Sequence, residues 1–423
     1  MRFGFAVDVG TTNIEISMWN LNSGVILGKK ISRNCLYLYG ADVVSRILYA
    51  HYNGVELLQN KLIAQLKDEF SQMIREFFAG SCDDFVADRA VFTGNTVMLH
   101  FLSGLSVAGF EKAPFSPVSL FGEVVPAASA LASLAKEVVL PPCIGAFLGA
   151  DIVCAALGVE EMLTCASLEA ENNATVGAVC EPIGGAEKPY IIIDIGTNTE
   201  IMLVDADGKR TACSAAAGPA FEGGGLSVEM KGSALVSELA RMLDEGIMDE
   251  TGFIGELSCS SDTSRDDQSS ESGGTKRRTI LSQQDVRQLQ LAKGATAAAV
   301  ETLLLSAGRE AAGKTNAEKY VSAPENLPES QLFNIQKCFI CGNFGNALDI
   351  DAVKKTGLLH AQLADSAVYA GNAALRGAEL ILLSKTAAFN RACEIAENTA
   401  VLQLADSAVF AEKYIKRMNF TVF

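Results

Sequence analysis

The sequence predicts an α/β fold of two homologous lobes that face each other across one cleft. The main observation is a repeated motif, FAVDVGTTNIE at residues 5–15 and IIIDIGTNTE at residues 191–200. Each copy has an apolar run without helical period that ends at Asp-x-Gly-Thr, which indicates a buried strand followed by a tight turn. The copies lie 186 positions apart (194 − 8). We therefore expect one copy in each lobe, with both turns facing the same ligand.

Both turns have the composition of an anion site. In each copy the strand brings a carboxylate, Asp8 or Asp194, to a turn rich in backbone N–H and hydroxyl groups. Such a turn binds anions, and a carboxylate beside it can hold Mg²⁺ through water. We expect a polyphosphate to lie between the two turns. The residues expected to cradle it are Gly10, Thr11, Thr12 and Asn13 on one side and Gly196, Thr197 and Asn198 on the other.

Length and composition fit a folded protein of two or three domains. The chain has 423 residues, of which 49% are hydrophobic and 20% charged, enough for sizeable cores. Its apolar stretches are too short or too interrupted to span a bilayer. Met1 and Arg2 lead directly into the first strand, which leaves no room for a signal peptide, so we expect a cytoplasmic protein. The net charge of −16 argues against a nucleic-acid partner.

The first lobe is expected to open with three strands at residues 3–9, 14–20 and 25–32, followed by a helix that starts at Asp42. Residues 55–78 carry apolar side chains at helical spacing and predict a long amphipathic helix. A short strand at 90–92 then leads into Thr93-Gly94-Asn95. This turn either faces the cleft or is an ordinary strand-to-helix turn. We assign no catalytic role to His100 on the helix that follows.

A small-residue helix is expected to join the lobes. Residues 138–156 predict a strand, a Pro-Pro-Cys turn and a helix in which Gly145, Gly149 and Ala150 permit close packing. Asp151 lies on this helix. It is either a carboxylate that positions water in the cleft or a surface residue of the helix.

The second lobe repeats the three-strand opening at residues 190–195, 200–204 and 209–213. The Gly-rich segment 215–225 can bring backbone amides against phosphate, and within it Glu222 and Gly223 are candidates for contacts to Mg²⁺-bound water or ribose. Further helices are expected over 286–306, capped by Asp285, and over 369–384 and 389–398, before a closing strand and helix. Listed in order, the expected units are lobe one at 1–160, a linker at 161–189, lobe two at 190–400 and a closing segment at 401–423.

Residues 258–278 predict a disordered insertion in the second lobe, because they are rich in Ser, Asp, Gly and Lys/Arg and nearly free of apolar side chains. The eleven cysteines are odd in number and lack regular spacing, which does not fit a disulfide framework. Cys338 and Cys341 form the single CxxC. They lie on an expected strand, where residues three apart face opposite sides, so we do not expect them to bind a metal together.

The pair of phosphate loops resembles the actin, heat-shock chaperone and sugar-kinase superfamily, whose lobes are ribonuclease H-like. Four further motifs narrow the resemblance to one branch, the ATPase domain (ASKHA type) of the ATP-dependent reductive activators of corrinoid proteins. The resemblance runs from Phe3 to about Asn419. The motifs are TGNTVMLHFL at 93–102, PPCIGAFLGAD at 141–151, AAGPAFEGGG at 216–225 and CGNFGNALD at 341–349.

This resemblance implies a protein that couples ATP hydrolysis to the reduction of an inactive cob(II)amide protein to cob(I)amide. Asp8 and Asp194 would hold Mg²⁺ through water and, with Asp151, form the catalytic group. The turn that receives adenosine would comprise Gly342, Asn343, Phe344 and Gly345, with Asn343 standing where the family has a second Gly. The expected partners are a corrinoid protein and a second copy of the chain, since the resemblance suggests a homodimer.

Two departures from the family pattern bear on function. The activators usually carry an N-terminal ferredoxin-like domain with a two-iron cluster, whereas this chain begins where their ATPase part begins, and no plant-type cysteine spacing occurs. We therefore expect no iron–sulfur cluster here and a separate ferredoxin-like electron donor. The strand-rich segment that usually follows the Gly-rich loop is also shortened, to residues 226–230.

Two other functions remain open at this point. One is a small-molecule kinase on the same fold, for which Asp151 is the candidate base near the γ-phosphate. The other is a non-catalytic scaffold whose cleft no longer binds nucleotide. The shortened second lobe and Asn343 favour the scaffold, whereas the intact Asp-Gly-Thr turns argue against it.

Overall fold

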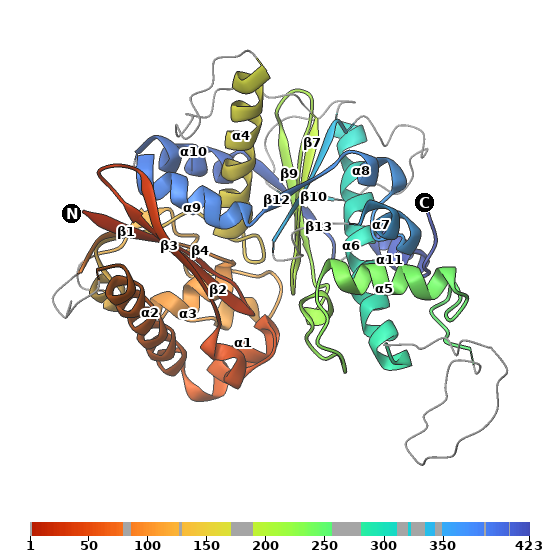
Figure 1. Ribbon diagram of the computed structural model, residues 1–423, viewed down its shortest axis with the longest axis horizontal. Helices are drawn as coiled ribbons and strands as arrows, with labels where there is room; N and C mark the ends of the chain where they lie inside the picture. Colours follow the sequence, from red (N-terminus) through yellow and green to blue (C-terminus); the bar gives the residue numbers. More distant parts are fainter. Residues whose placement is uncertain are drawn as a thin grey trace, which may run out of the picture.

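The computed structural model describes residues 2–78, 86–126, 129–170, 189–255, 281–310, 320–322, 335–342, 349–384, 386–405 and 407–423. Within these ranges the chain forms two α/β lobes, each built on one mixed sheet (Figure 1). Two helices that pack on each other, α4 (Ala150–Ala170) and α9 (Ala373–Ser384), lie between the lobes. This is the two-lobed α/β architecture that the sequence predicts. The expected insertion at 258–278 lies outside the described residues.

The sheet of lobe I has the strand order β3-β2-β1-β4-β6-β5. Its first three strands form the expected antiparallel meander, and β4 and β6 then run parallel to β1. Because β1 is central and covered on both faces, nearly every residue in it is apolar and buried. The strands are β1 (Phe3–Val9), β2 (Asn13–Asn20), β3 (Val25–Arg33), β4 (Ala87–Thr93), β5 (Glu123–Val124) and β6 (Ala135–Leu140).

Helices of lobe I cover one face of this sheet. The predicted amphipathic helix is confirmed as α2 (Val55–Phe78), and its ring of Phe70 stacks on Phe5 of β1 at a centroid distance of 3.9 Å. The helix expected after Asp42 is confirmed as α1 (Val43–Asn53), with Asp42 as its N-cap. The short η1 (Cys35–Tyr39) precedes α1, and α3 (Thr96–Ser103) follows β4.

The sheet of lobe II has the order β10-β13-β9-β8-β7-β11-β12. Its opening meander matches the prediction within one or two residues, and the last strand in the chain, β13, is inserted between β9 and β10. The strands are β7 (Tyr190–Ile195), β8 (Thr199–Val204), β9 (Arg210–Ala215), β10 (Tyr320–Ser322), β11 (Lys337–Cys341), β12 (Ala367–Gly371) and β13 (Thr399–Gln403).

Three helix predictions in the second half were wrong in their starts. The helix expected over 389–398 is α10 (Thr386–Glu397), which begins before residue 389. Residues 369–371 are not helical, because they belong to β12, which pairs in parallel with β11. The strand ends at Gly371, whose φ is +63°, and α9 begins at Ala373, after Asn372. The helix expected after Asp285 begins earlier, as α6 (Gln283–Glu310). Its cap is Ser282, whose Oγ accepts from Asp285 N–H at 3.2 Å while the Asp285 carboxylate accepts from Ser282 N–H at 2.9 Å.

The remaining helices of lobe II pack around α6 and the sheet. Near the C-terminus, α11 lies along α6, where the ring of Tyr414 closely approaches Gly294. The elements are η4 (Pro219–Glu222), α5 (Ser233–Asp244), α7 (Ile350–Thr356), α8 (Ala361–Asp365) and α11 (Ala408–Arg417). None of the helices in the described ranges is long and apolar enough to cross a membrane.

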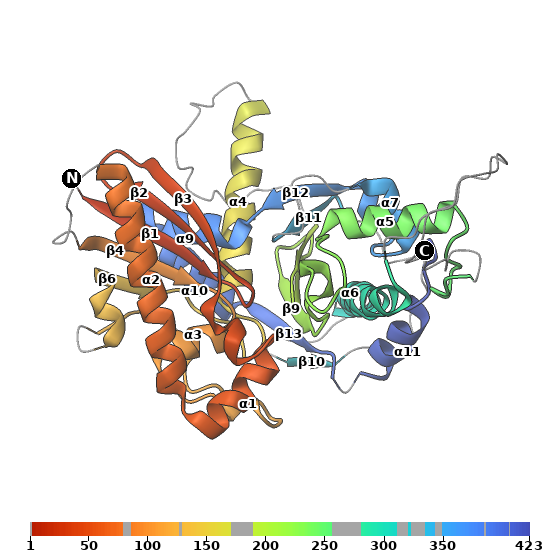
Figure 2. The ribbon, with the colours of Figure 1, turned by 60° about the horizontal axis from the view of Figure 1, so that its bottom comes forward.

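The lobes are joined by α4 (Ala150–Ala170), α9 (Ala373–Ser384) and α10 (Thr386–Glu397). Figure 2 shows α4 between the lobes. The backbones of α4 and α9 touch, since a Cβ added at Gly377 would lie 2.0 Å from the carbonyl oxygen of Cys154. Although α9 follows a strand of lobe II, it packs against β1 and β4 of lobe I. One apolar cluster therefore includes both sheets, with Val91 from lobe I and Ile192 from lobe II.

The proposed division of the chain can be compared with this packing. The expected linker at 161–189 begins inside α4, and its residues 171–188 lie outside the described ranges. Both α9 and α10 fall within 190–400 by sequence, yet α9 packs on lobe I, and β13 spans the proposed boundary at 400. The boundaries of the proposed units remain a proposal.

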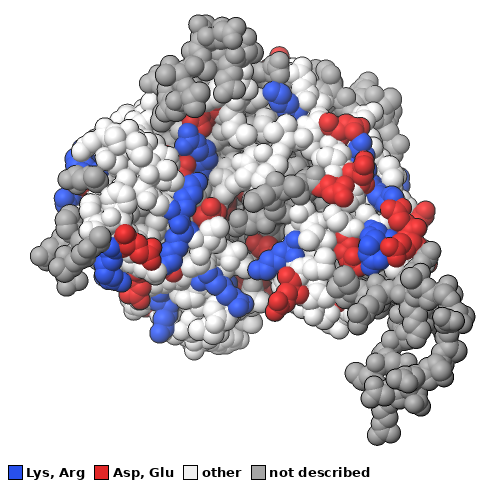
Figure 3. All heavy atoms as spheres, viewed as in Figure 1, with Lys and Arg blue, Asp and Glu red and all other residues white. Residues whose placement is uncertain are grey.

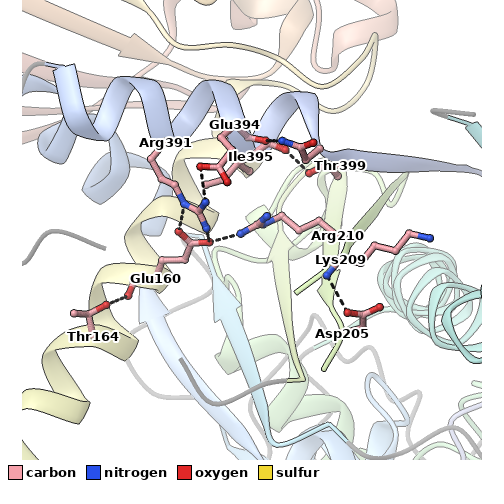
Figure 4. Close-up of polar contacts among 10 residues, drawn as sticks. Glu160, Thr164, Asp205, Lys209, Arg210, Arg391, Glu394, Ile395 and Thr399 are labelled. Atoms are coloured by element: carbon pink, nitrogen blue, oxygen red, sulfur yellow. Dashed lines mark hydrogen bonds and ion pairs between the residues drawn. The ribbon is translucent and has the colours of Figure 1, made fainter. Parts of the chain in front are cut away.

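An ionic cluster fastens the joining helices to lobe II (Figure 4). The Glu160 carboxylate on α4 accepts hydrogen bonds from Arg210 of β9 at 2.7 Å and from Arg391 of α10 at 2.9 Å. Glu160 and Arg210 are buried, so this cluster joins three elements in a low-dielectric environment.

On the face of the molecule seen in Figure 3, Lys and Arg form a narrow band over lobe I and no broad basic patch.

Candidate functional site

A cavity of about 80 Å³ lies between the two lobes. Its walls come from both repeated turns, the start of α4 and the ends of β11 and β12, so each lobe contributes to it. Three of its lining residues also belong to the joining helices or their caps. The lining residues are Asp8, Gly10, Thr11, Asn13, Glu15, Asn95, Asp151, Asp194, Ile195, Gly196, Thr197, Asn198, Glu200, Glu222, Gly342, Asn372 and Ala374.

The two repeated turns present equivalent pairs of carboxylates. In lobe I, Asp8 of β1 stands directly opposite Glu15 of β2 in the antiparallel register. In lobe II, Asp194 of β7 stands opposite Glu200 of β8 in the same way. Residues opposite each other across two strands have neighbouring side chains. The motif therefore places an Asp–Glu pair at each side of the cavity, of which the sequence predicts only the two aspartates as site residues.

Glycines let the backbone approach these pairs closely. Gly342 follows β11 with φ +88°, and a Cβ there would lie 2.4 Å from Asp194 Oδ1. Gly149 precedes α4, and a Cβ there would lie 2.4 Å from the Cα of Asn95. Only glycine fits these two approaches, which bring the end of β11 and the start of α4 to the edge of the cavity.

Asp151 is in the first turn of α4 and lines the cavity, so the structure places it on the cleft and not on the outer surface. The backbone N–H groups of Ala150 and Asp151 donate to the Gly94 carbonyl at 3.0 and 3.3 Å. This anchors α4 to the turn after β4, which is accordingly the cleft-facing turn of the two alternatives. The Asp151 carboxylate accepts from the Ile152 N–H at 2.8 Å.

Glu222 connects the two turns. Its Oε2 accepts hydrogen bonds from Thr12 Oγ1, at 2.7 Å, and from Thr197 Oγ1. The two hydroxyl oxygens lie 3.5 Å apart. A carboxylate thus stands between the hydroxyl groups of the two loops, and the loops touch in this closed conformation.

Burial and mutual repulsion change the acidity of the cavity carboxylates. The pKa of Asp8 is raised to about 8, mainly by burial and further by the charges of Asp151 and Asp194. The hydrogen bond from Asn372 lowers this pKa and so opposes the other two causes. Burial together with the charges of Asp151 and Glu222 raises the pKa of Asp194 to about 7. The pKa of Asp151 is raised to about 6 by burial, against backbone hydrogen bonds that lower it. These carboxyl groups therefore favour bound protons or a cation.

The site residues predicted from sequence can now be placed. Most of them line the cavity; Thr12 does not line it but reaches it through Glu222, and Gly223 does not line it. Asn343, Phe344 and Gly345 of the predicted adenosine turn lie outside the described residues. Sequence reasoning missed Asn372, which donates to Asp8 Oδ2 at 2.9 Å and Glu15 Oε2 at 2.8 Å. The signal for it is Gly-Asn directly before a small-residue helix, which is typical of an N-cap.

The cavity suits a magnesium–nucleotide complex by its donor atoms. All its charged side chains are carboxylates, and carboxylate and hydroxyl oxygens are the donors that Mg²⁺ prefers. Within the described ranges, no three His, Cys, Asp or Glu side chains converge closely enough to hold a metal ion by themselves. A metal here would accordingly complete its coordination with water and with oxygens of the ligand.

His100 and the Cys338–Cys341 pair, to which the sequence assigns no catalytic or metal-binding role, are packed inside the structure. His100 is buried, its Nδ1 lies 2.7 Å from the Thr96 carbonyl, and its pKa is lowered by burial. Cys338 packs in the core of lobe II, whereas Cys341 packs in the cluster between the lobes. The two thiols therefore lie on opposite faces of β11, as predicted.

Comparison with known proteins agrees with this architecture. Residues 3–163 match the model of the RACo middle region. Residues 188–232, 228–313 and 328–422 match the model of the C-terminal domain of RACo, the ASKHA domain. Together the two matches cover nearly all of both lobes.

Individual relatives are similar over different shares of their length. The chain is 27% identical to the corrinoid activation enzyme RamQ of Eubacterium limosum, over 99% of this chain and 70% of the relative. It is 24% identical to a [Co(II) methylated amine-specific corrinoid protein] reductase of Methanosarcina barkeri, over 55% of this chain and 39% of the relative. A solved reductive activator for a corrinoid, iron–sulfur protein superposes with a TM-score of 0.73 at 25% identity, over 100% of this chain and 66% of the solved chain.

Proposed function

Since the chain belongs to the RACo family, we propose that it is an ATP-binding and ATP-hydrolysing activator that assists the reductive reactivation of a corrinoid protein. In that reaction one electron converts cob(II)amide to cob(I)amide, while ATP and water become ADP and phosphate. The electron would come from a separate iron–sulfur protein. The observation that carries the proposal is that both Asp-Gly-Thr turns, one from each lobe, line the same cavity.

The charge of the cavity supports a metal-bound nucleotide as its ligand. Its described lining has six carboxylates, Asp8, Glu15, Asp151, Asp194, Glu200 and Glu222, and no Lys, Arg or His. A bare polyphosphate would be repelled by these groups at close range. The same groups attract a cation, so the proposal requires Mg²⁺ and predicts that nucleotide binding fails without it.

Each proposed site residue has a role in this complex. Asp8 and Asp194 would hold Mg²⁺ through water, and the loop residues Gly10–Asn13 and Gly196–Asn198 would bind phosphate oxygens with their N–H and hydroxyl groups. When bound, Mg²⁺ neutralises negative charge on the phosphates. Asp151 would accept a hydrogen bond from the attacking water and orient it. Gly342 and the three residues after it would flank the adenosine.

Opening and closing of the cleft offers a way to use ATP energy. We propose that the lobes part to admit a nucleotide, because the described cavity of about 80 Å³ is small and Glu222 bridges the two turns across it. Parting separates Thr12 from Glu222 and Thr197. Because α4 and α9 pack on each other between the lobes, such a motion changes the surface presented to a partner. In the proposed homodimer, each of the two chains would contain one such cleft.

A small-molecule kinase is the second candidate, favoured by one observation. Asp151 lines the cavity, and its pKa of about 6, raised by burial, is suited to a base near neutral pH. A kinase would need a second substrate beside the γ-phosphate. If the protein transfers the γ-phosphate of ATP to water and to no small-molecule acceptor, that result supports the activator over the kinase.

Calorimetric titration of Mg-ATP into the wild type and an Asp8→Ala, Asp194→Ala double variant tests the proposal. We expect binding by the wild type, loss of at least about 100-fold in the double variant, and no binding in EDTA. Asp207→Ala, in the exposed turn between β8 and β9, is the control and should bind like the wild type. A wild type that does not bind Mg-ATP would refute both ATP-dependent functions and leave the scaffold.

The corrinoid step needs its own measurement. With a corrinoid protein and a reduced ferredoxin added, the wild type should produce cob(I)amide, detected by corrinoid absorbance, only when Mg-ATP is present. Equal reduction with and without ATP, or none with a set of corrinoid proteins, would contradict the activator function.

A further inference from the structure

Three asparagines that cap helices surround the turn between β1 and β2. Each uses its Oδ1 to accept a backbone N–H in the first turn of its helix, which fixes the orientation of the side chain. Asn34 accepts from Leu36 N–H at 2.9 Å, before η1. Asn95 accepts from Met98 N–H at 2.9 Å, before α3, and Asn372 accepts from Leu375 N–H at 2.8 Å, before α9.

Each of these side chains also donates its Nδ2 to the same turn. Asn34 donates to the Gly10 carbonyl at 2.8 Å, and Asn95 donates to Thr11 Oγ1 at 3.1 Å. Asn372 donates to two carboxylates, at 2.9 Å to Asp8 Oδ2 and at 2.8 Å to Glu15 Oε2. The opposite orientation of the Asn372 amide is excluded, because it would set Oδ1 against two carboxylate oxygens and leave the Leu375 N–H without its acceptor.

Asn372 differs from the other two in what it holds and where it lies. Its two acceptors belong to the Asp–Glu pair, whose charges repel each other, whereas the other two asparagines bind neutral oxygens. It also stands at the point where the chain leaves β12 of lobe II and enters α9, which packs on lobe I. One amide therefore joins the carboxylate pair of lobe I to the crossover between the lobes.

We propose that Asn372 is a positioning residue that sets the carboxylates of Asp8 and Glu15 for the water-coordinated Mg²⁺ of the nucleotide complex. This inference rests on the proposed function and assigns it one further residue. By taking one oxygen of each carboxylate, the amide fixes both rotamers. Within the described contacts it leaves Asp8 Oδ1 and Glu15 Oε1 available to water on the metal. Hydrogen-bonding partners of metal-binding carboxylates typically change metal affinity by about 10- to 100-fold.

The test is Asn372→Ser, because Ser is also a good N-cap and keeps the start of α9 while removing the amide. We expect the Mg²⁺ concentration that half-saturates nucleotide binding to rise about 10-fold or more. Thermal unfolding of the variant shows whether the fold is retained.

Asn34→Ser is the matched control. It likewise keeps a cap and removes an amide from the same turn, but the amide it removes binds a neutral carbonyl. Its effect on nucleotide affinity should be the same at all Mg²⁺ concentrations. A Mg²⁺ dependence that changes equally in Asn34→Ser and Asn372→Ser, or in neither, would overturn the inference.

Binding of Mn²⁺ alone, followed by electron paramagnetic resonance, separates the inference from the proposed function. A wild type that binds Mn²⁺ but no nucleotide refutes the proposed function. The role of Asn372 in positioning Asp8 and Glu15 for a metal ion then stands if Asn372→Ser weakens Mn²⁺ binding and falls if it does not. A wild type that binds neither Mn²⁺ nor nucleotide refutes both.

Discussion

The two lobes carry the same motif but complete it with different contacts. In lobe I the Asp8–Glu15 pair receives hydrogen bonds from the side chain of Asn372. In lobe II no side chain within the described residues donates to Asp194, and the backbone at Gly342 packs directly against it. Lobe I is therefore sensitive to the hydrogen-bonding chemistry of a side chain, whereas lobe II is sensitive to added volume.

The difference also appears in the acidity of the two aspartates. The pKa of Asp8 is raised to about 8 and that of Asp194 to about 7, in both cases mainly by burial. Asp8 receives an amide hydrogen bond that lowers its pKa, but burial, the largest cause, together with the charges of Asp151, Asp194 and Glu15 outweighs it. The donated hydrogen bond thus only partly offsets burial and the nearby negative charge in lobe I.

The largest expected effect is on the pH dependence of stability of the metal-free protein. Both pKa values lie above the ordinary 3.8, so the native state keeps protons that the unfolded chain loses. This stabilisation is complete below about pH 4 and is lost as pH rises to about 8 for Asp8 and about 7 for Asp194. Urea unfolding from pH 5 to 9 should show stability falling by up to about 1.4 kcal/mol per pH unit for each group.

Asp8→Asn and Asp194→Asn should each remove one such slope, and the effect of Asp8→Asn should extend about one pH unit higher. Asp88→Asn is the control in lobe I: burial would raise the pKa of Asp88, but hydrogen bonds from Lys136 and the Phe3 N–H keep it lowered. It should not change the slope above pH 5. Identical pH profiles for the two cavity variants would remove the distinction between the lobes.

The next effect in size is steric and belongs to lobe II. Gly342→Ala places a Cβ 2.4 Å from Asp194 Oδ1 at a backbone φ of +88°, and we expect a loss of about 2–4 kcal/mol in stability and weaker Mg-ATP binding. Gly371→Ala is matched to it, because its φ is +63° but no atom lies within 4 Å of the added Cβ. It should cost only about 1 kcal/mol. Equal losses in urea unfolding would show that Asp194 is not confined by Gly342.

The smallest expected effect compares the two threonines bound to Glu222. Thr197→Val removes a buried hydroxyl that donates to a carboxylate and should cost about 2 kcal/mol. Thr12→Val removes a less buried donor to the same oxygen and should cost about 1 kcal/mol. Urea unfolding of the two variants in parallel measures the difference. A larger loss for Thr12→Val would mean that Glu222 is held mainly by lobe I.

Much of this architecture could be predicted from local sequence. The two Asp-x-Gly-Thr turns, both meanders, the bounds of α2 and the opposite faces of Cys338 and Cys341 follow from periodicity and turn residues, which depend on neighbours within a few positions. Asp8, Asp194 and the loop residues that line the cavity lie in the repeated motif and were predicted with it, whereas Glu15 and Glu200 of the same motif were not.

The remaining features depended on contacts between distant segments. The Gly-Asn before α9 is enough to predict a helix cap. The acceptors of the Asn372 Nδ2 group, Asp8 and Glu15, lie 364 and 357 positions away and are brought to it only when the chain crosses from β12 to lobe I. Likewise, the sequence places Asp151 on a helix, and only the packing of Gly149 against Asn95 turns it toward the cavity. Local patterns fix turns and helix starts, whereas the direction of a side chain from a helix end depends on what the other lobe places beside it.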